Sequence, residues 1–181
     1  MARIGLKNFR YSELDASENP STPKSLGKAI DCKVSLELNS AELYGDDALC
    51  ESDYTFNKGT VTITVDDDDD TVLAPLLGHT ISEDGEIVRK DTDVAPYIAF
   101  GRILTKIVGG TYKYKVEFLS KVKFKDTMPD EATKGESIEF TTVSIEGSVA
   151  RKSNGEWSKS KTFTSYSEAS EYLDSLLTHT A

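Results

Sequence analysis

The 181-residue chain has little of what catalysis and metal binding most often use: two histidines, two cysteines and one tryptophan. His79 and His179 have no motif around them that would support a Ser/His/Asp or Cys/His arrangement. Cys32 and Cys50 lack the spacing of metal ligands, and no glycine-rich phosphate loop is present. We therefore expect a protein that is not an enzyme and has no cofactor and no metal.

Long apolar runs are also missing from the sequence. The first ten residues contain no stretch that could act as a signal peptide, and no segment approaches the length of a membrane span. We expect a protein that is made in the cytoplasm and has no membrane partner.

Positive charge is scarce and unevenly placed. The chain has 21 Lys and Arg against 31 Asp and Glu, a net charge of -10, which argues against binding to a nucleic-acid backbone. Residues 37–93 hold 16 acidic and three basic residues, whereas residues 94–125 hold seven basic residues and one acidic residue. A chain divided in this way favours self-association.

Most of the chain has the pattern of β-strands, in one domain over residues 1–181. Apolar residues alternate with polar ones over 28–38 and again over 60–65. The first alternation predicts one buried face, made of Ile30, Cys32, Val34, Leu36 and Leu38. Residues 136–150 and 156–163 are predicted to pair as a hairpin around a turn at 153–155. The expected fold is mainly β, a β-sandwich or partly closed barrel.

Two helices are predicted beside the strands. Residues 71–77 form a short helix that starts after five aspartates and stops near Gly78; Pro75 is its one unfavourable residue. Residues 165–177 form a C-terminal helix with one apolar stripe and a capping-box pattern at its start. The aspartates 66–70 either cap the short helix or bind Ca²⁺ or Mg²⁺; capping is favoured because the spacing of a calcium-binding loop is missing.

A hairpin is predicted across Gly109 and Gly110. With these two glycines as the turn, Arg102 lies opposite Glu117, which supports the register. The same register puts Lys106 opposite Lys113, which is unfavourable unless an acidic surface covers them. The lysine face of this hairpin is either solvated or docks on acidic residues of another copy.

The acidic segment 39–58 has no clear period and is predicted to be a long loop. Apolar side chains are scattered among its carboxylates, so it is either a segment that orders on contact or a flexible loop. Trp157 also has two interpretations, as a platform for carbohydrate or as a hydrophobic anchor beside a turn.

Taken in order, several short motifs resemble the major tail proteins of phages and prophages of Gram-positive bacteria that have long, non-contractile tails. The resemblance runs nearly end to end. It is carried by Met-Ala-Arg-Ile-Gly-Leu-Lys-Asn-Phe at the start and by residues 43–53, 62–70, 76–79, 91–97, 113–118 and 154–157.

This resemblance implies a tail-tube subunit, a β-sandwich with a flanking helix that closes into hexameric rings, which stack into a hollow tube. The partners would be further copies of the chain and other tail proteins, such as the tape measure and the tail terminator. DNA would pass through the bore without specific binding, and the protein would be located in the virion tail. The alternative is a β-sandwich module that binds carbohydrate or a host surface.

The resemblance also implies two contact regions. In such tubes hairpins of neighbouring copies join an inner barrel, and a long loop bridges successive rings. The candidate residues of the inter-subunit hairpin are Arg102, Lys106, Lys113, Lys115 and Glu117. Those of the ring-stacking loop are Leu43, Tyr44, Asp46, Asp47, Leu49, Glu51, Asp53 and Tyr54.

Overall fold

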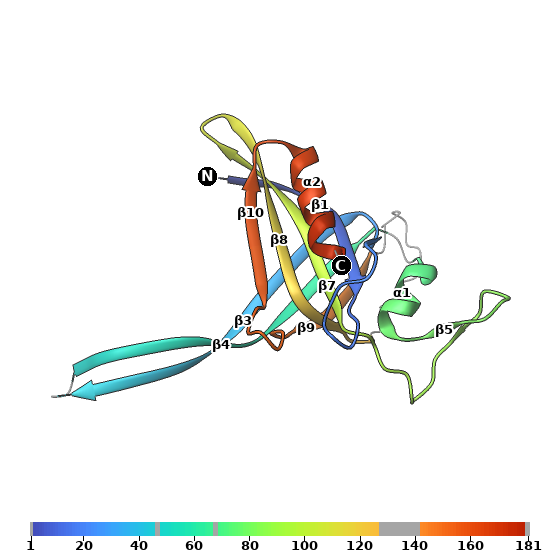
Figure 1. The fold of residues 1–181 in the computed structure, drawn as a ribbon, viewed down its shortest axis with the longest axis horizontal. Helices are drawn as coiled ribbons and strands as arrows, with labels where there is room; N and C mark the ends of the chain where they lie inside the picture. Colours follow the sequence, from blue (N-terminus) through green and yellow to red (C-terminus); the bar gives the residue numbers. More distant parts are fainter. Residues whose placement is uncertain (1, 46–47, 67–68, 127–141, 180–181) are drawn as a thin grey trace, which may run out of the picture.

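The fold is mainly β, with two helices and one large antiparallel sheet (Figure 1). The computed structural model describes residues 2–45, 48–66, 69–126 and 142–179, and for 43–45 and 48–50 the course of the backbone. The elements are β1 (Ala2–Glu13), β2 (Lys24–Ser25), β3 (Ala29–Gly45), β4 (Ala48–Val65), α1 (Asp70–Leu77), β5 (Thr80–Ile81), β6 (Ile87–Val88), β7 (Ile98–Val108), β8 (Thr111–Phe124), β9 (Val143–Val149), β10 (Ser158–Phe163) and α2 (Tyr166–Leu177).

The large sheet has the strand order β2-β1-β7-β8-β9-β4-β3, with β10 paired to β8, while β5 and β6 form a separate small hairpin. The sheet curls, so that β1 also contacts β3 although the two strands are not paired. Side chains from β1, β4, β7, β8, β9 and α1 fill the inside of this curl, among them Phe9, Ile63, Phe100 and Phe124. The predicted mainly-β class with a short helix and a C-terminal helix is confirmed.

The β7–β8 hairpin has the predicted register. Pairs run from Val108↔Thr111 to Phe100↔Leu119 without a slip, and include Arg102↔Glu117. Gly109 and Gly110 both have positive φ, 58° and 79°, as a two-residue turn between twisted strands requires. β1 pairs along the other edge of β7 and β10 along the other edge of β8, so this hairpin lies within the sheet rather than beyond it.

The segment expected to be a loop, residues 39–58, is instead the outer part of a β-hairpin. β3 and β4 pair from Ala29↔Val65 to Gly45↔Ala48, and their outer halves leave the body as a long projection (Figure 1). We call this projection the arm, residues 38–45 of β3 and 48–56 of β4. The loop prediction is wrong for the described part of 39–58. The strands were hidden by a β-bulge where Glu37↔Lys58 gives way to Leu38↔Phe56, because a bulge breaks the alternation.

The prediction of a buried face on β3 is only partly correct. Cys32 and Val34 are half-buried against the core, whereas Ile30, Leu36 and Leu38 are 49 %, 44 % and 52 % exposed. The alternation itself is present, but β3 runs past the end of the core, and among the described residues no strand pairs with its outer edge. The outer part of the stripe is therefore apolar and exposed.

β9 and β10 do not pair with each other, so the predicted hairpin is wrong. Both pair with β8 on the same edge, β9 at 122–124 and β10 at 114–119. They run in the same direction, and the turn at 152–156 links them end to end. β9 also pairs with β4 over 143–149, and this long-range pairing replaces the local one. Residues 136–141 of the predicted strand lie outside the described residues.

Both helices start and stop where predicted. α1 follows Asp69, whose side chain accepts a hydrogen bond from the Thr71 backbone N–H, and Gly78 ends it in the left-handed conformation. α2 packs on β7 and β8 and buries Ala169, Leu173 and Leu177. Its Ser165 forms no side-chain capping bond, so the predicted capping box does not form.

Candidate assembly surface

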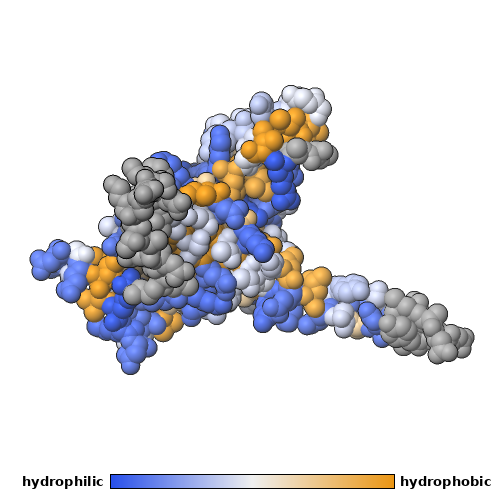
Figure 2. All heavy atoms as spheres, turned by 180° about the vertical axis from the view of Figure 1, so that it is seen from behind, coloured by the Kyte–Doolittle hydropathy of each residue, from blue (hydrophilic) through white to orange (hydrophobic). Residues whose placement is uncertain are grey.

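The two faces of the arm differ: one is apolar near the root and carries Glu42 further out, and the other is acidic. Cross-strand partners share a face, so Leu38 and Phe56 lie on one side together with Ser40 and Tyr54. Leu38 is 52 % exposed and Tyr54 58 %. Figure 2 shows hydrophobic surface at the root of the arm, followed by pale and hydrophilic residues toward its end.

The other face of the arm is acidic. It carries Glu51 and Asp53, two residues apart on β4, both exposed and without an ion-pair partner within the described residues. Of the predicted stacking residues, the structure therefore places Glu51 and Asp53 on one face and Tyr54 on the other. Asp46 and Asp47 lie outside the described residues. Leu43, Tyr44 and Leu49 lie in the arm, where the structure describes the course of their backbone only.

The root of the arm is attached to the body by an aromatic stack. Phe56 lies parallel to Trp157, with ring centroids 4.6 Å apart and planes 2° apart. One face of the Trp157 ring is therefore covered by the arm. This geometry favours the anchor interpretation of Trp157 over that of a carbohydrate platform.

A second surface lies near the turn of the β7–β8 hairpin. Arg3 of β1 pairs with Lys106 of β7, and Lys106 pairs with Lys113 of β8. Directly paired residues point to the same face, so three cations stand side by side across three strands. We call this set the cationic row. Within the described part of the chain, none of the three has an ion-pair partner, and like charges placed directly opposite destabilise a sheet.

The remaining predicted hairpin residues form one ion-pair network. Arg102 donates to Glu117 at 2.7 Å and Lys115 donates to its other oxygen at 2.6 Å. Burial alone would raise the pKa of Glu117, but the hydrogen bonds from Lys115 and Arg102 outweigh burial and hold the pKa below its ordinary value. Arg102 also contacts the Cys32 carbonyl and thiol, and burial raises the pKa of that thiol. This network therefore ties β7 and β8 to β3.

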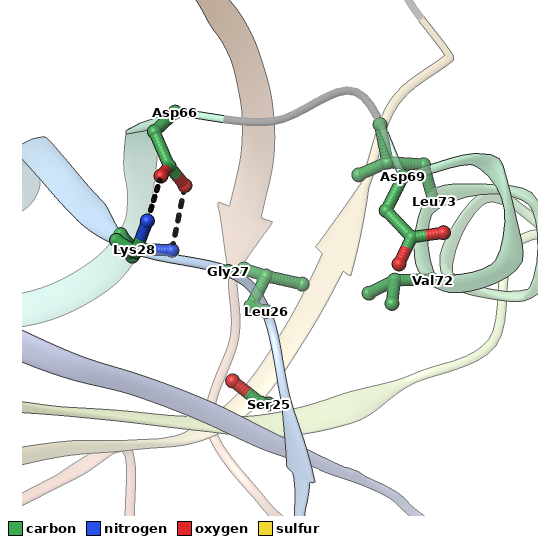
Figure 3. A pocket seen from close by; sticks show the side chains of 8 residues that line it. All are labelled: Ser25, Leu26, Gly27, Lys28, Asp66, Asp69, Val72 and Leu73. Atoms are coloured by element: carbon green, nitrogen blue, oxygen red, sulfur yellow. Dashed lines mark hydrogen bonds and ion pairs between the residues drawn. The ribbon is translucent and has the colours of Figure 1, made fainter.

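Two aspartates of the acidic run, Asp66 and Asp69, form hydrogen bonds with nearby parts of the chain. Figure 3 shows the Asp66 carboxylate bonded to Lys28. The backbone N–H of Lys28 donates to Oδ1 at 2.9 Å, and the Lys28 Nζ lies 3.1 Å from Oδ2. Asp69 points from the other side of the same hollow and caps α1 through Thr71. Asp67 and Asp68 lie outside the described residues. Among the residues that are described, no group of three His, Cys, Asp or Glu side chains could hold a metal ion.

His79 takes part in a cluster that sequence reasoning missed. Its Nδ1 lies 2.9 Å from Asp93 and its Nε2 3.2 Å from Asp126, and its side chain is 5 % exposed. The bond from His79, with a backbone N–H from Lys90, holds the pKa of Asp93 below its usual range. The cluster joins the end of α1 to the segment before β7 and to the end of β8. No local motif signals it, because its members are far apart in sequence.

Glu18 forms a clamp between two loops, which the sequence did not indicate. It accepts from Lys121 Nζ at 2.6 Å and from both the backbone N–H and the hydroxyl of Ser153, each at 2.8 Å. These bonds hold the pKa of Glu18 at about 2, from an ordinary 4.5. The clamp fixes the loop after β1 to the turn between β9 and β10. It also engages Lys121, one of the basic residues of segment 94–125.

Glu18→Gln is expected to lower stability at neutral pH and to lose this effect in acid. A carboxylate whose pKa is lowered by folding stabilises the fold fully above its ordinary value of 4.5, and progressively less as the pH falls toward about 2. The urea midpoint of the variant should lie below that of the wild type at pH 7, with a smaller gap at pH 3. Glu83→Gln, at an exposed position between β5 and β6, is the matched control and should leave both midpoints unchanged. An equal gap for Glu18→Gln at both pH values would contradict this account.

Neither a scan against models of protein families nor a search of curated proteins gave a match to this chain. Neither helix, within the described residues, has the length and apolar character needed to cross a membrane.

Proposed function

We propose that this chain is a structural, self-assembling subunit of a phage tail tube, in which copies close into hexameric rings that stack into a hollow conduit for DNA. The motifs that resemble major tail proteins suggest this function. The mainly antiparallel sheet, the flanking α1 and the C-terminal α2 are compatible with it.

The arm is the observation that carries the proposal. A two-stranded hairpin alone in water is marginally stable, and this one extends well beyond the core with apolar side chains exposed on one face. The long outer edge of β3 has no strand partner within the described residues, and edges of this kind invite pairing with another chain. A surface supplied by a second copy would cover both features, and a bridge between successive rings is the role that the arm would take.

The remaining features suit a passive conduit. No step of catalysis is required, because the tube acts as a rigid bore whose wall does not hold its cargo. The net charge of -10 for each chain would make a ring strongly acidic, and an acidic wall repels phosphate over a distance of about 8 Å at physiological salt. In this proposal the protein belongs to the virion tail, and its partners include the tape measure and the tail terminator.

Electron microscopy of the purified protein tests the proposal directly. Negative-stain images at increasing protein concentration should show rings and then tubes. A glycan array run in parallel tests the alternative of a carbohydrate-binding module and should show no binding. A protein that stays monomeric at high concentration and binds a glycan would refute the tail-tube proposal.

A further inference from the structure

The cationic row has no anionic partner among the described residues of its own chain. Arg3, Lys106 and Lys113 are held in direct register on three strands, where their mutual repulsion opposes folding. Glu117, a carboxylate on the same face of β8 as Lys113, is already bonded to Arg102 and Lys115. An anion placed over the row would remove this repulsion.

The acidic face of the arm matches the row in charge and in size. Glu51 and Asp53 are both exposed and project from the same face of β4, about 7 Å apart along the strand. The row spans two inter-strand spacings, about 10 Å. Two carboxylates at that separation fit within the row, and the long lysine side chains can adjust to them.

The arm of the same chain cannot provide this contact. The arm projects away from the body, well apart from the turn between β7 and β8 (Figure 1). A second copy is not restricted in this way, and the row is accessible to it, because Arg3 is exposed and Lys106 and Lys113 are half-buried.

We propose that the cationic row of one copy binds the acidic face of the arm of a second copy, with Glu51 and Asp53 placed over Arg3, Lys106 and Lys113. This inference rests on the proposed function, since it names the contact that joins the copies. It assigns the arm a specific receiving surface. It also removes the repulsion among the three cations of the row, which destabilises the isolated chain.

A reciprocal charge exchange tests the contact. The row variant is Lys106→Glu/Lys113→Glu, the arm variant is Glu51→Lys/Asp53→Lys, and a third protein carries all four changes. Self-association is measured by sedimentation velocity over a range of concentrations, with negative-stain images of the same samples. Each two-site variant should associate about 10-fold more weakly than the wild type or worse, and the four-site variant should recover to near the wild-type affinity. The control Arg89→Glu/Lys90→Glu alters an exposed pair and has the same change of charge as the row variant. It should associate as the wild type does.

A single substitution separates loss of contact from loss of folding. Lys106→Glu places a carboxylate between Arg3 and Lys113, so two repulsive cross-strand pairs become attractive. Its Tm should rise by about 2 °C while its self-association weakens. A variant that is more stable yet associates less cannot be explained by misfolding.

The outcomes distinguish this contact from the proposed function. If the wild type forms tubes and the row variant does too, or if the four-site variant stays as weak as the two-site variants, the contact is wrong and the function stands. If the charge exchange restores association but no rings or tubes form, the contact stands and the function is wrong. A wild type that stays monomeric overturns both. A short DNA duplex that binds the wild type but not the row variant, with association unchanged, would assign the row to phosphate and overturn the contact.

Discussion

Tubes are expected to disappear, and the folded body to remain, when residues 41–53 are replaced by Asn-Gly. Ser40 and Tyr54 are cross-strand partners, so a two-residue turn can close the shortened hairpin without changing its register. The removed part contributes no side chain to the described core, and the Tm should therefore stay within about 2 °C of the wild type. Negative-stain images should show monomers or single rings only. Tubes of normal length would refute the assignment of the arm to ring stacking.

Point variants show which property of the arm matters. Leu38→Ser/Tyr54→Ser keeps the length of the arm but removes two exposed apolar side chains from one face. Asn39→Ser/Thr55→Ser changes a registered pair on the opposite face and is the matched control. The first variant should shorten or abolish tubes and the second should leave them unchanged. If both variants assemble normally, the apolar face of the arm has no part in assembly.

Leu173→Ala is expected to have the largest effect on folding, about 3 kcal/mol of lost stability. Leu173 is fully buried between α2 and the sheet, against the β7 position occupied by Gly101. A Cβ at that glycine would overlap the Leu173 side chain, so the helix and the strand approach as closely as the glycine allows. The cavity left by alanine lies within this tight contact, and the neighbouring backbone has little room to close it.

The loss should be visible as a fall of about 10 °C in Tm by differential scanning calorimetry. Glu171→Ala, at an exposed position on the same helix, is the control and should change stability by no more than about 0.5 kcal/mol. A small effect of Leu173→Ala would mean that α2 contributes little to the stability of the sheet. Gly101→Ala makes the reciprocal test, because it should also destabilise, through overlap rather than through a cavity.

The parts of the fold that local chemistry determines were predictable. The two glycines at 109 and 110, together with the opposite charges of Arg102 and Glu117, fixed one hairpin and its register. Asp69 and Gly78 marked the two ends of α1. In each case the signal lies within a few residues or within one hairpin, so no distant part of the chain is needed to interpret it.

The arm was not predictable from simple alternation. Apolar residues of β4 fall at odd positions in Val61 and Ile63 but at even positions in Tyr54 and Phe56, and the change of phase occurs at the bulge. A strict period of two therefore fails across the segment, although each half obeys it. The change of phase between two alternating runs was the available signal for a single bulged strand.

The contacts of the candidate sites depend on pairing between distant segments. Arg3 joins Lys106 and Lys113 only because β1 pairs with β7. In the same way, β9 pairs with the distant β4 and not with β10, its neighbour in sequence. Glu18 and His79 gain their partners in the same way, from residues far along the chain. Short-range patterns carry no information about such pairings.

The arm and the cationic row are different surfaces, and this has a consequence for symmetry. A contact between them is heterologous, because each copy offers an arm to one neighbour and a row to another. It cannot be completed by two copies related by a two-fold axis that use a single shared patch. Such a contact either closes as a ring or continues without limit, and an open assembly has a polarity, with unused arms at one end and unused rows at the other. Growth and its termination would then require two chemically different end proteins.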